Sequence, residues 1–91
     1  MPYILQKNRE KFEVALLQLE EELTEHGRGW FPATGELNFV ISSLIWRLFD
    51  RRPSYTLGND LVGVLECVKA EFIRRRLNPY EDKKIQENGD L

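Results

Sequence analysis

The sequence predicts an all-α fold: a compact antiparallel three-helix bundle with a short fourth helix at the C-terminus. Three observations favour this fold. Apolar residues recur at intervals of three and four along three long stretches. Glycine and proline interrupt the pattern at Gly27, Pro53, Pro79 and Gly89, where helices commonly end or begin. No stretch alternates apolar and polar residues for long enough to predict a strand.

The first expected helix runs from an N-cap at Asn8 to about His26. Its apolar side chains share one face, and they are Phe12, Ala15, Leu16, Leu19 and Leu23. Gly27 is placed to end this helix in a left-handed conformation. Residues 1–7 form an N-terminal arm, whose apolar part is expected to pack on its own bundle or on a second subunit.

The second expected helix, about Glu36 to Arg51 with a start at Thr34 or Gly35, is the most apolar element. Its wide apolar face consists of Leu37, Val40, Ile41, Leu44, Ile45, Leu48 and Phe49. Phe39 and Trp46 add a second apolar edge. A helix that is apolar around so much of its circumference is typical of an element surrounded by neighbours, so we expect it to be the central helix.

The third expected helix runs from about Leu57 to Leu77, with Ser54 or Thr56 as its N-cap. Its apolar face consists of Leu57, Leu61, Val64, Leu65, Val68 and Phe72. The Asn78-Pro79 pair is expected to end it and to start a short fourth helix, because proline suits the first helical position. This helix would run to about Asn88 and stop at Gly89, so residues 79–91 form a short helix and an acidic tail.

Size and charge narrow the functional classes. The 91 residues predict a single helical domain spanning 1–91, and a homodimer would supply burial that so short a chain lacks. Thirteen Lys+Arg against fifteen Asp+Glu give a net charge of -2, which provides no overall basic excess for nucleic-acid binding. A single cysteine, Cys67, excludes an intramolecular disulfide, and a free thiol fits a cytoplasmic location.

Membrane and secretory segments are not expected. No stretch approaches the roughly 18 to 20 apolar residues of a membrane span. Polar residues from Gln6 to Arg9 follow the first five residues, so the N-terminus lacks the apolar centre of a secretory signal. We therefore predict no membrane partner.

The C-terminal third carries a resemblance to a known family. Residues 63–76 are followed by Pro-Tyr-Glu-Asp at positions 79–82 and Glu-Asn-Gly-Asp at positions 87–90. These segments are similar to a family of small uncharacterised proteins of bacteria and phages. Residues 1–4 and 35–41 resemble the opening and the second helix of that family. The family has no assigned activity, so the resemblance implies no site residue.

Enzymatic interpretations find little support. No phosphate-binding loop, nucleophile elbow or dinucleotide fingerprint is present. Cys67 lies far in sequence from His26, and a core thiol explains it more simply than a Cys-His pair does. We predict no catalytic residue, no cofactor and no metal site.

One metal-dependent alternative remains open. Glu22 and Glu25 share a helix face and resemble part of the Mg²⁺ site of MazG-type nucleotide pyrophosphohydrolases. The available partners, Glu66 and Glu71, are five residues apart and fall on different faces. A metal-dependent nucleotide hydrolase is therefore the least favoured alternative.

Macromolecular binding is the favoured class. The candidate interaction residues are Trp30, Phe31, Trp46, Arg51, Arg52, Arg74, Arg75, Arg76 and Tyr80. Trp30 and Phe31 lie in a loop, where they either fold back on the core or meet a partner. The sequence therefore predicts a non-enzymatic protein–protein interaction or oligomerisation module. The alternative is a nucleic-acid-binding protein in which the arginines contact phosphates and Tyr80 stacks on a base.

Overall fold

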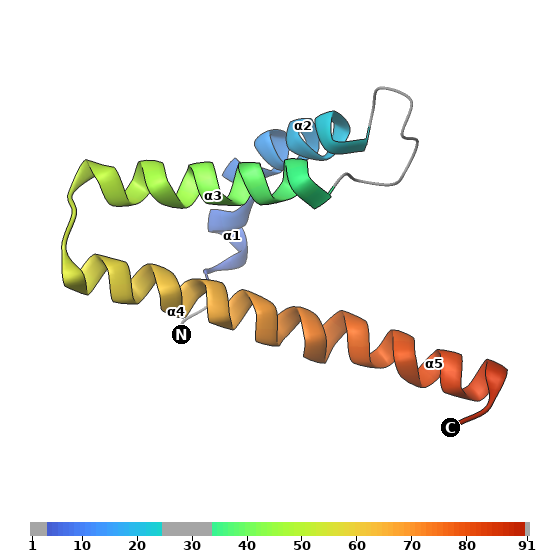
Figure 1. Cartoon of the computed structure of the whole chain (residues 1–91). Helices are drawn as coiled ribbons and strands as arrows, with labels where there is room; N and C mark the ends of the chain where they lie inside the picture. The colour runs from blue at the N-terminus through green and yellow to red at the C-terminus, as the bar shows by residue number, and fades with distance from the viewer. Residues whose placement is uncertain (1–3, 25–33, 91) are drawn as a thin grey trace. The chain divides into compact units, whose positions relative to one another are not determined.

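The computed structural model describes residues 4–24 and 34–90. The helices, in chain order, are α1 (Gln6–Arg9), η1 (Glu10–Phe12), α2 (Glu13–Thr24), α3 (Thr34–Arg51), α4 (Tyr55–Phe72), η2 (Ile73–Leu77) and α5 (Asn78–Asn88) (Figure 1). The two described ranges contain no strand, so the predicted all-α class is confirmed. The chain divides into two units, one with residues 2–52 and one with residues 53–91, and each is described by itself.

The first helical path begins earlier than predicted. Asn8 was expected as the N-cap, but it lies inside the first turn of α1, and its N–H donates to the Leu5 carbonyl at 2.9 Å. The Arg9 guanidinium bonds the Ile4 carbonyl through Nε at 3.2 Å and Nη2 at 3.0 Å. These two bonds satisfy the Ile4 carbonyl. The N-cap position of α1 is Leu5, whose side chain accepts no hydrogen bond from the first turn.

Helix α3 agrees with its predicted limits. It starts at Thr34 and ends at Arg51, two residues before Pro53. The Arg52 N–H donates to the Phe49 carbonyl at 3.1 Å, a tightened last turn that satisfies one of the terminal carbonyls. A residue that precedes proline is restricted in its backbone angles, and Arg52 accordingly lies outside the helix.

The start of α4 confirms Ser54 as the cap. Ser54 has extended backbone angles, and its Oγ accepts a hydrogen bond from the Leu57 N–H at 3.0 Å. Its carbonyl accepts from the Gly58 N–H at 3.0 Å, which is the first bond of the helical ladder. Thr56, the other predicted cap, lies within the first turn.

The predicted interruption at Asn78-Pro79 is corrected by the structure. The backbone stays helical at Leu77 and Asn78, and the Asn78 N–H donates to the Ile73 carbonyl, five residues earlier. This bond makes η2 a π turn. Within an α-helix the proline ring clashes with the carbonyl four residues earlier, and a widened turn just before Pro79 relieves such a clash without ending the helix.

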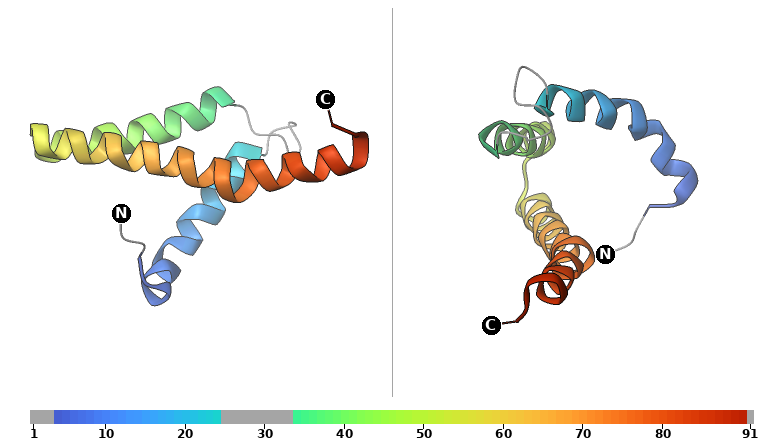
Figure 2. Two further views of the ribbon diagram at one scale, coloured as in Figure 1. Left: turned by 90° about the horizontal axis from the view of Figure 1, so that it is seen from below. Right: turned by 90° about the vertical axis from the view of Figure 1, so that its right-hand side faces the viewer.

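Helices α4, η2 and α5 therefore follow one another as a single helical rod, which the views of Figure 2 also show. They contain 18, 5 and 11 residues, so the rod is about 50 Å long at 1.5 Å per residue. It ends where predicted, at Gly89. The glycine has φ +88°, and its N–H donates to the Ile85 carbonyl at 2.8 Å.

The predicted core side chains are not buried in either unit. Among the residues that the structure describes, none is buried. Trp46 is 66% exposed and Phe39 is 71% exposed, although both belong to the helix that was expected to be central. The antiparallel bundle and the single domain of residues 1–91 therefore stay predictions.

Candidate interaction surfaces

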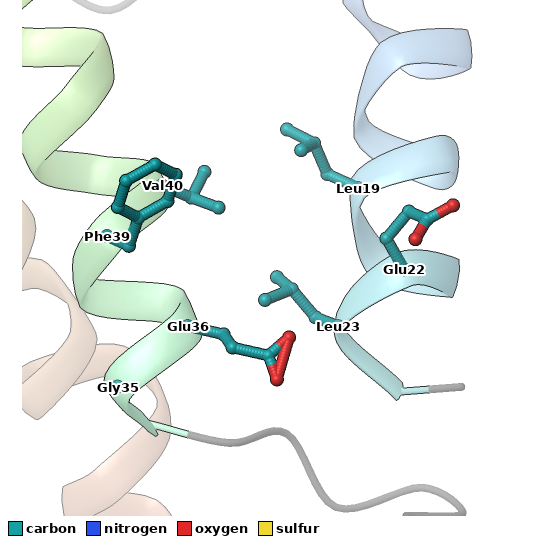
Figure 3. A pocket seen from close by; sticks show the side chains of 7 residues that line it. All are labelled: Leu19, Glu22, Leu23, Gly35, Glu36, Phe39 and Val40. Atoms are coloured by element: carbon teal, nitrogen blue, oxygen red, sulfur yellow. The ribbon is translucent and has the colours of Figure 1, made fainter. Parts of the chain in front are cut away.

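Helices α2 and α3, which belong to the same unit, flank a groove with a volume of about 360 Å³. Its lining residues are Leu19, Glu22, Leu23, Gly35, Glu36, Phe39 and Val40. Figure 3 shows Leu19 and Leu23 extending from α2 toward α3, while Val40 and Glu36 extend from α3 toward α2. The groove combines apolar walls with two glutamates, of which Glu36 extends across it and Glu22 turns its carboxylate away from α3 (Figure 3).

Helix α3 has two apolar faces on opposite sides. One consists of Leu37, Ile41, Leu44 and Leu48, at the spacing of one helical stripe. The other contains Phe39 and Trp46, which are seven residues apart, and Phe39 also lines the groove. One neighbouring helix can cover only one of these two faces.

The C-terminal end of α3 holds two of the predicted arginines. Arg51 lies in the last turn and Arg52 directly follows it. Positive charge at this position interacts favourably with the helix dipole, a structural contribution of about 0.3–1 kcal/mol. These two arginines therefore have a role in helix stability that needs no ligand.

The three arginines of the second cluster lie within the π turn. Arg74 Nη2 contacts Glu71 Oε2 at 3.0 Å, and Arg75 Nη1 contacts the same oxygen at 3.6 Å. Arg76 donates from Nη1 to the Arg75 carbonyl at 3.1 Å. One carboxylate thus serves two guanidinium groups, which leaves the cluster basic. Ion pairs as exposed as these contribute little to stability.

The π turn changes which side chains share a face. Leu77 and Tyr80 follow Phe72 by five and eight residues. In an uninterrupted α-helix they would lie about 140° and 80° around the axis from Phe72. A π turn adds one residue to a turn, which reduces these angles to about 40° and 20°. The apolar face of α4 therefore continues along α5.

Tyr80 is the aromatic centre of this continuation. The side chains of Phe72, Leu77 and Tyr80 are 58%, 38% and 57% exposed. The Lys84 Nζ lies 5.5 Å from the centre of the Tyr80 ring and 3.2 Å from Glu87 Oε2. We name this surface, made of Phe72, Arg76, Leu77, Tyr80 and Lys84, the π-turn face.

The structure therefore sorts the predicted interaction residues into groups. Trp46, Arg51 and Arg52 lie on α3, in the unit of residues 2–52. Arg74, Arg75, Arg76 and Tyr80 lie together on η2 and α5. Trp30 and Phe31 lie outside the described residues. Sequence reasoning missed the π-turn face, although the eight-residue step from Phe72 to Tyr80 was a signal of a shifted register.

The described residues give no geometric support to the metal-site hypothesis or to the Cys-His hypothesis. Among residues 4–24 and 34–90, no three His, Cys, Asp or Glu side chains gather as a metal site. Glu25 and His26, which the metal and thiol hypotheses need, are outside those ranges. Cys67 is a half-buried free thiol. No helix in the described part of the chain is long and apolar enough to cross a membrane.

Comparison with known proteins identifies a family and no activity. Residues 1–91 match the family model described as "Domain of unknown function (DUF6899)". This agrees with the expected resemblance to an uncharacterised family. No curated protein and no solved structure matches the chain.

Proposed function

We propose that this chain, which belongs to the DUF6899 family over residues 1–91, is a non-enzymatic self-association module. Its helices pack as an antiparallel bundle, and a second copy completes the apolar core. The observation that supports this proposal is the exposure of large apolar side chains on α2, α3 and α4 together with the absence of any buried residue among those described.

The rod of α4, η2 and α5 supports the proposal of a partner. Within its own unit this rod has no second helix against which to pack. Helices in water gain most of their stability from packing an amphipathic face. Burial of one large apolar side chain contributes about 1.5–3 kcal/mol, and α4 presents six on one face. Covering this face is worth roughly the whole net stability of a small domain.

The two apolar faces of α3 support the proposal that this helix contacts a second copy as well as helices of its own chain. Helix α4 can cover the face that contains Leu37 and Leu44, and α2 flanks the Phe39 end of the other face. Trp46 lies seven residues beyond Phe39, about 10 Å along the axis. Tryptophan is enriched among residues that dominate protein–protein binding energy. In the proposed dimer Trp46 lies in the interface between copies.

Solution mass tests this proposal. Light scattering behind size exclusion, at two protein concentrations and two salt concentrations, is expected to give twice the chain mass of 10.8 kDa. The dimer is expected to persist at high salt, because apolar burial is not screened by ions. Trp46→Ala is expected to weaken it, while Asn59→Ala, on the polar side of α4, serves as the matched control. A 10.8 kDa species with concentration-independent cooperative unfolding would refute self-association.

Nucleic-acid binding is the second candidate, and one observation favours it. The exposed Tyr80 ring has Lys84 beside it, and Arg76 precedes it by four residues. Aromatic rings beside cations bind single-stranded nucleic acid by stacking and charge. Fluorescence anisotropy with labelled single-stranded and duplex DNA and RNA tests it. Affinity that falls steeply between low and high salt would support this candidate, and no binding at low salt would exclude it.

A further inference from the structure

We infer that Ser54 is a phosphorylation site for a serine/threonine kinase that binds arginine side chains before the acceptor hydroxyl. Arg51 and Arg52 precede Ser54 by three and two residues, with Pro53 between. Three features of this segment support the inference: an extended backbone at Ser54, exposure to solvent, and positive charge before the hydroxyl. The proposed self-association does not use the segment, so the two proposals are independent.

The backbone at Ser54 has the form in which a peptide enters an enzyme groove. Ser54 lies outside the helices, whereas the other serines of the chain, Ser42 and Ser43, belong to α3. Its φ of −161° and ψ of 158° are extended angles. Extended segments bind in grooves because their backbone groups are available to pair with the enzyme. Among the serines, Ser54 is therefore the one presented for transfer.

The Ser54 hydroxyl is accessible. Residues 51–55 are all exposed. Ser54 Oγ accepts a hydrogen bond from the Leu57 N–H at 3.0 Å. A hydroxyl oxygen has two lone pairs, so this bond leaves one lone pair for attack and does not use the hydroxyl hydrogen. Thr24, in contrast, donates its hydroxyl hydrogen to the Glu20 carbonyl at 2.8 Å.

Arg51 and Arg52 supply the charge by which such a kinase recognises its substrate. Neither guanidinium forms an ion pair with a residue in the ranges 4–24 and 34–90. A guanidinium binds a carboxylate through two parallel hydrogen bonds, so carboxylates in a kinase groove can hold both side chains. Charge patterns of this kind contribute to the choice of substrate by kinases.

The reaction is a phosphoryl transfer from Mg-ATP. Ser54 Oγ attacks the γ-phosphorus, and a new O–P bond forms as the bond from the γ-phosphorus to the β,γ-bridging oxygen breaks. ADP leaves, and the hydroxyl proton passes to the carboxylate base of the kinase. This chain supplies the nucleophile and the two cations, and the kinase supplies the base and the nucleotide site.

The added phosphate acts on the start of α4. It carries a charge of about −1.5 to −2 at neutral pH. The first N–H groups of a helix have no partner within the helix, and the helix dipole favours negative charge there. Charge-assisted hydrogen bonds from these N–H groups to phosphate oxygens are stronger than a bond to a neutral hydroxyl. We therefore expect amide exchange at residues 55–57 to slow after phosphorylation.

Phosphorylation of the full chain tests the inference. The probes are Mg-ATP and the catalytic subunit of cyclic-AMP-dependent protein kinase, and tandem mass spectrometry locates the product. We expect one phosphoryl group, on Ser54. Arg51→Ala and Arg52→Ala are each expected to lower kcat/KM about tenfold or more, because each removes a charge-assisted pair. Arg47→Ala, which removes an exposed arginine within α3, is the matched control.

The contrary results are specific. No transfer to the wild-type chain, or transfer to Ser42, Ser43 or Thr56 instead, would overturn the inference, as would equal kcat/KM for wild type and both arginine variants. The chain isolated from its native cells is expected to carry the same phosphate, and its absence there would also overturn the inference. Because Ser54→Ala also removes the α4 cap, Ser54→Thr, which keeps a hydroxyl, is the variant expected to remain a substrate.

Discussion

The backbone N–H of Asn78, the residue directly before Pro79, donates its hydrogen bond to the carbonyl of Ile73, five residues earlier. This relationship lets a helix pass through a proline that would otherwise end it. It also rotates α5 by about 100° relative to α4, which places Leu77 and Tyr80 near the face of Phe72. A backbone feature of one turn thus extends the apolar face of α4 toward α5.

Removal of the proline is expected to restore a regular helix. Pro79→Ala supplies the missing N–H and is expected to raise helicity, since proline is about 3 kcal/mol less favourable than alanine within a helix. Because the π turn is then no longer favoured, Leu77 and Tyr80 rotate away from Phe72. Backbone NMR chemical shifts of residues 72–80 and the dimer dissociation constant measure both effects.

The dimer dissociation constant of the Pro79→Ala chain tests whether the register of α5 affects association. We expect dimerisation to weaken several-fold although the helix becomes more stable. Glu81→Ala, two residues later in α5, controls for an added alanine. Unchanged dimerisation by a chain with regular helical shifts would show that the register of α5 does not matter for association.

Loss of the α4 cap is expected to cost stability. Ser54→Ala removes the oxygen that accepts from the Leu57 N–H at 3.0 Å. The free energy of unfolding, measured by urea titration, is expected to fall by about 1 kcal/mol. Ser54→Asp keeps an acceptor and is expected to preserve most of this stability. An equal loss in both variants would argue against the cap.

Two glycines are expected to respond in opposite ways to the same substitution. Gly89 has φ +88° and nothing within 4 Å of an added Cβ, so Gly89→Ala is strained by the backbone alone. We expect it to destabilise the end of α5 by about 1 kcal/mol, seen as faster amide exchange at the last turn. The open space around Gly89 excludes a steric clash as the cause.

Gly63 lies within α4 and also has nothing within 4 Å of an added Cβ. Gly63→Ala is therefore expected to raise the free energy of unfolding by about 0.5–1 kcal/mol, because alanine is the better helix former. Urea titration measures it beside Gly89→Ala. A decrease instead would indicate that another helix approaches α4 at Gly63, as the small residues nearby at Cys67 and Ala70 would permit.

Trp46 is expected to report association directly. In a chain that lacks Trp30, obtained as Trp30→Phe, Trp46 is the remaining tryptophan. Its emission is expected to shift to shorter wavelength, and its quenching by acrylamide to decrease, as protein concentration rises through the dimer constant. Emission that does not change with concentration while the measured mass doubles would place Trp46 outside the interface.

Most helix ends were predictable because they depend on neighbours within about four residues. Ser54 caps α4 and Gly89 ends α5, as short-range hydrogen bonding and glycine geometry predict. Asn8 failed as a cap because the helix begins before it, with Leu5 at the N-cap position and the Asn8 N–H already bonded to the Leu5 carbonyl. A residue type that favours caps does not by itself fix which turn comes first.

The sequence by itself determined the all-α class, the limits of α3 and the apolar faces of the helices, because periodicity and capping are local properties of the chain. Only the tertiary structure decided that Leu19 and Leu23 of α2 face Val40 of α3 across a groove, since that contact joins residues about twenty apart. The structure also decided the register of α5. Pro79 can end a helix or follow a π turn, and the hydrogen bond from Asn78 to Ile73 selects the second.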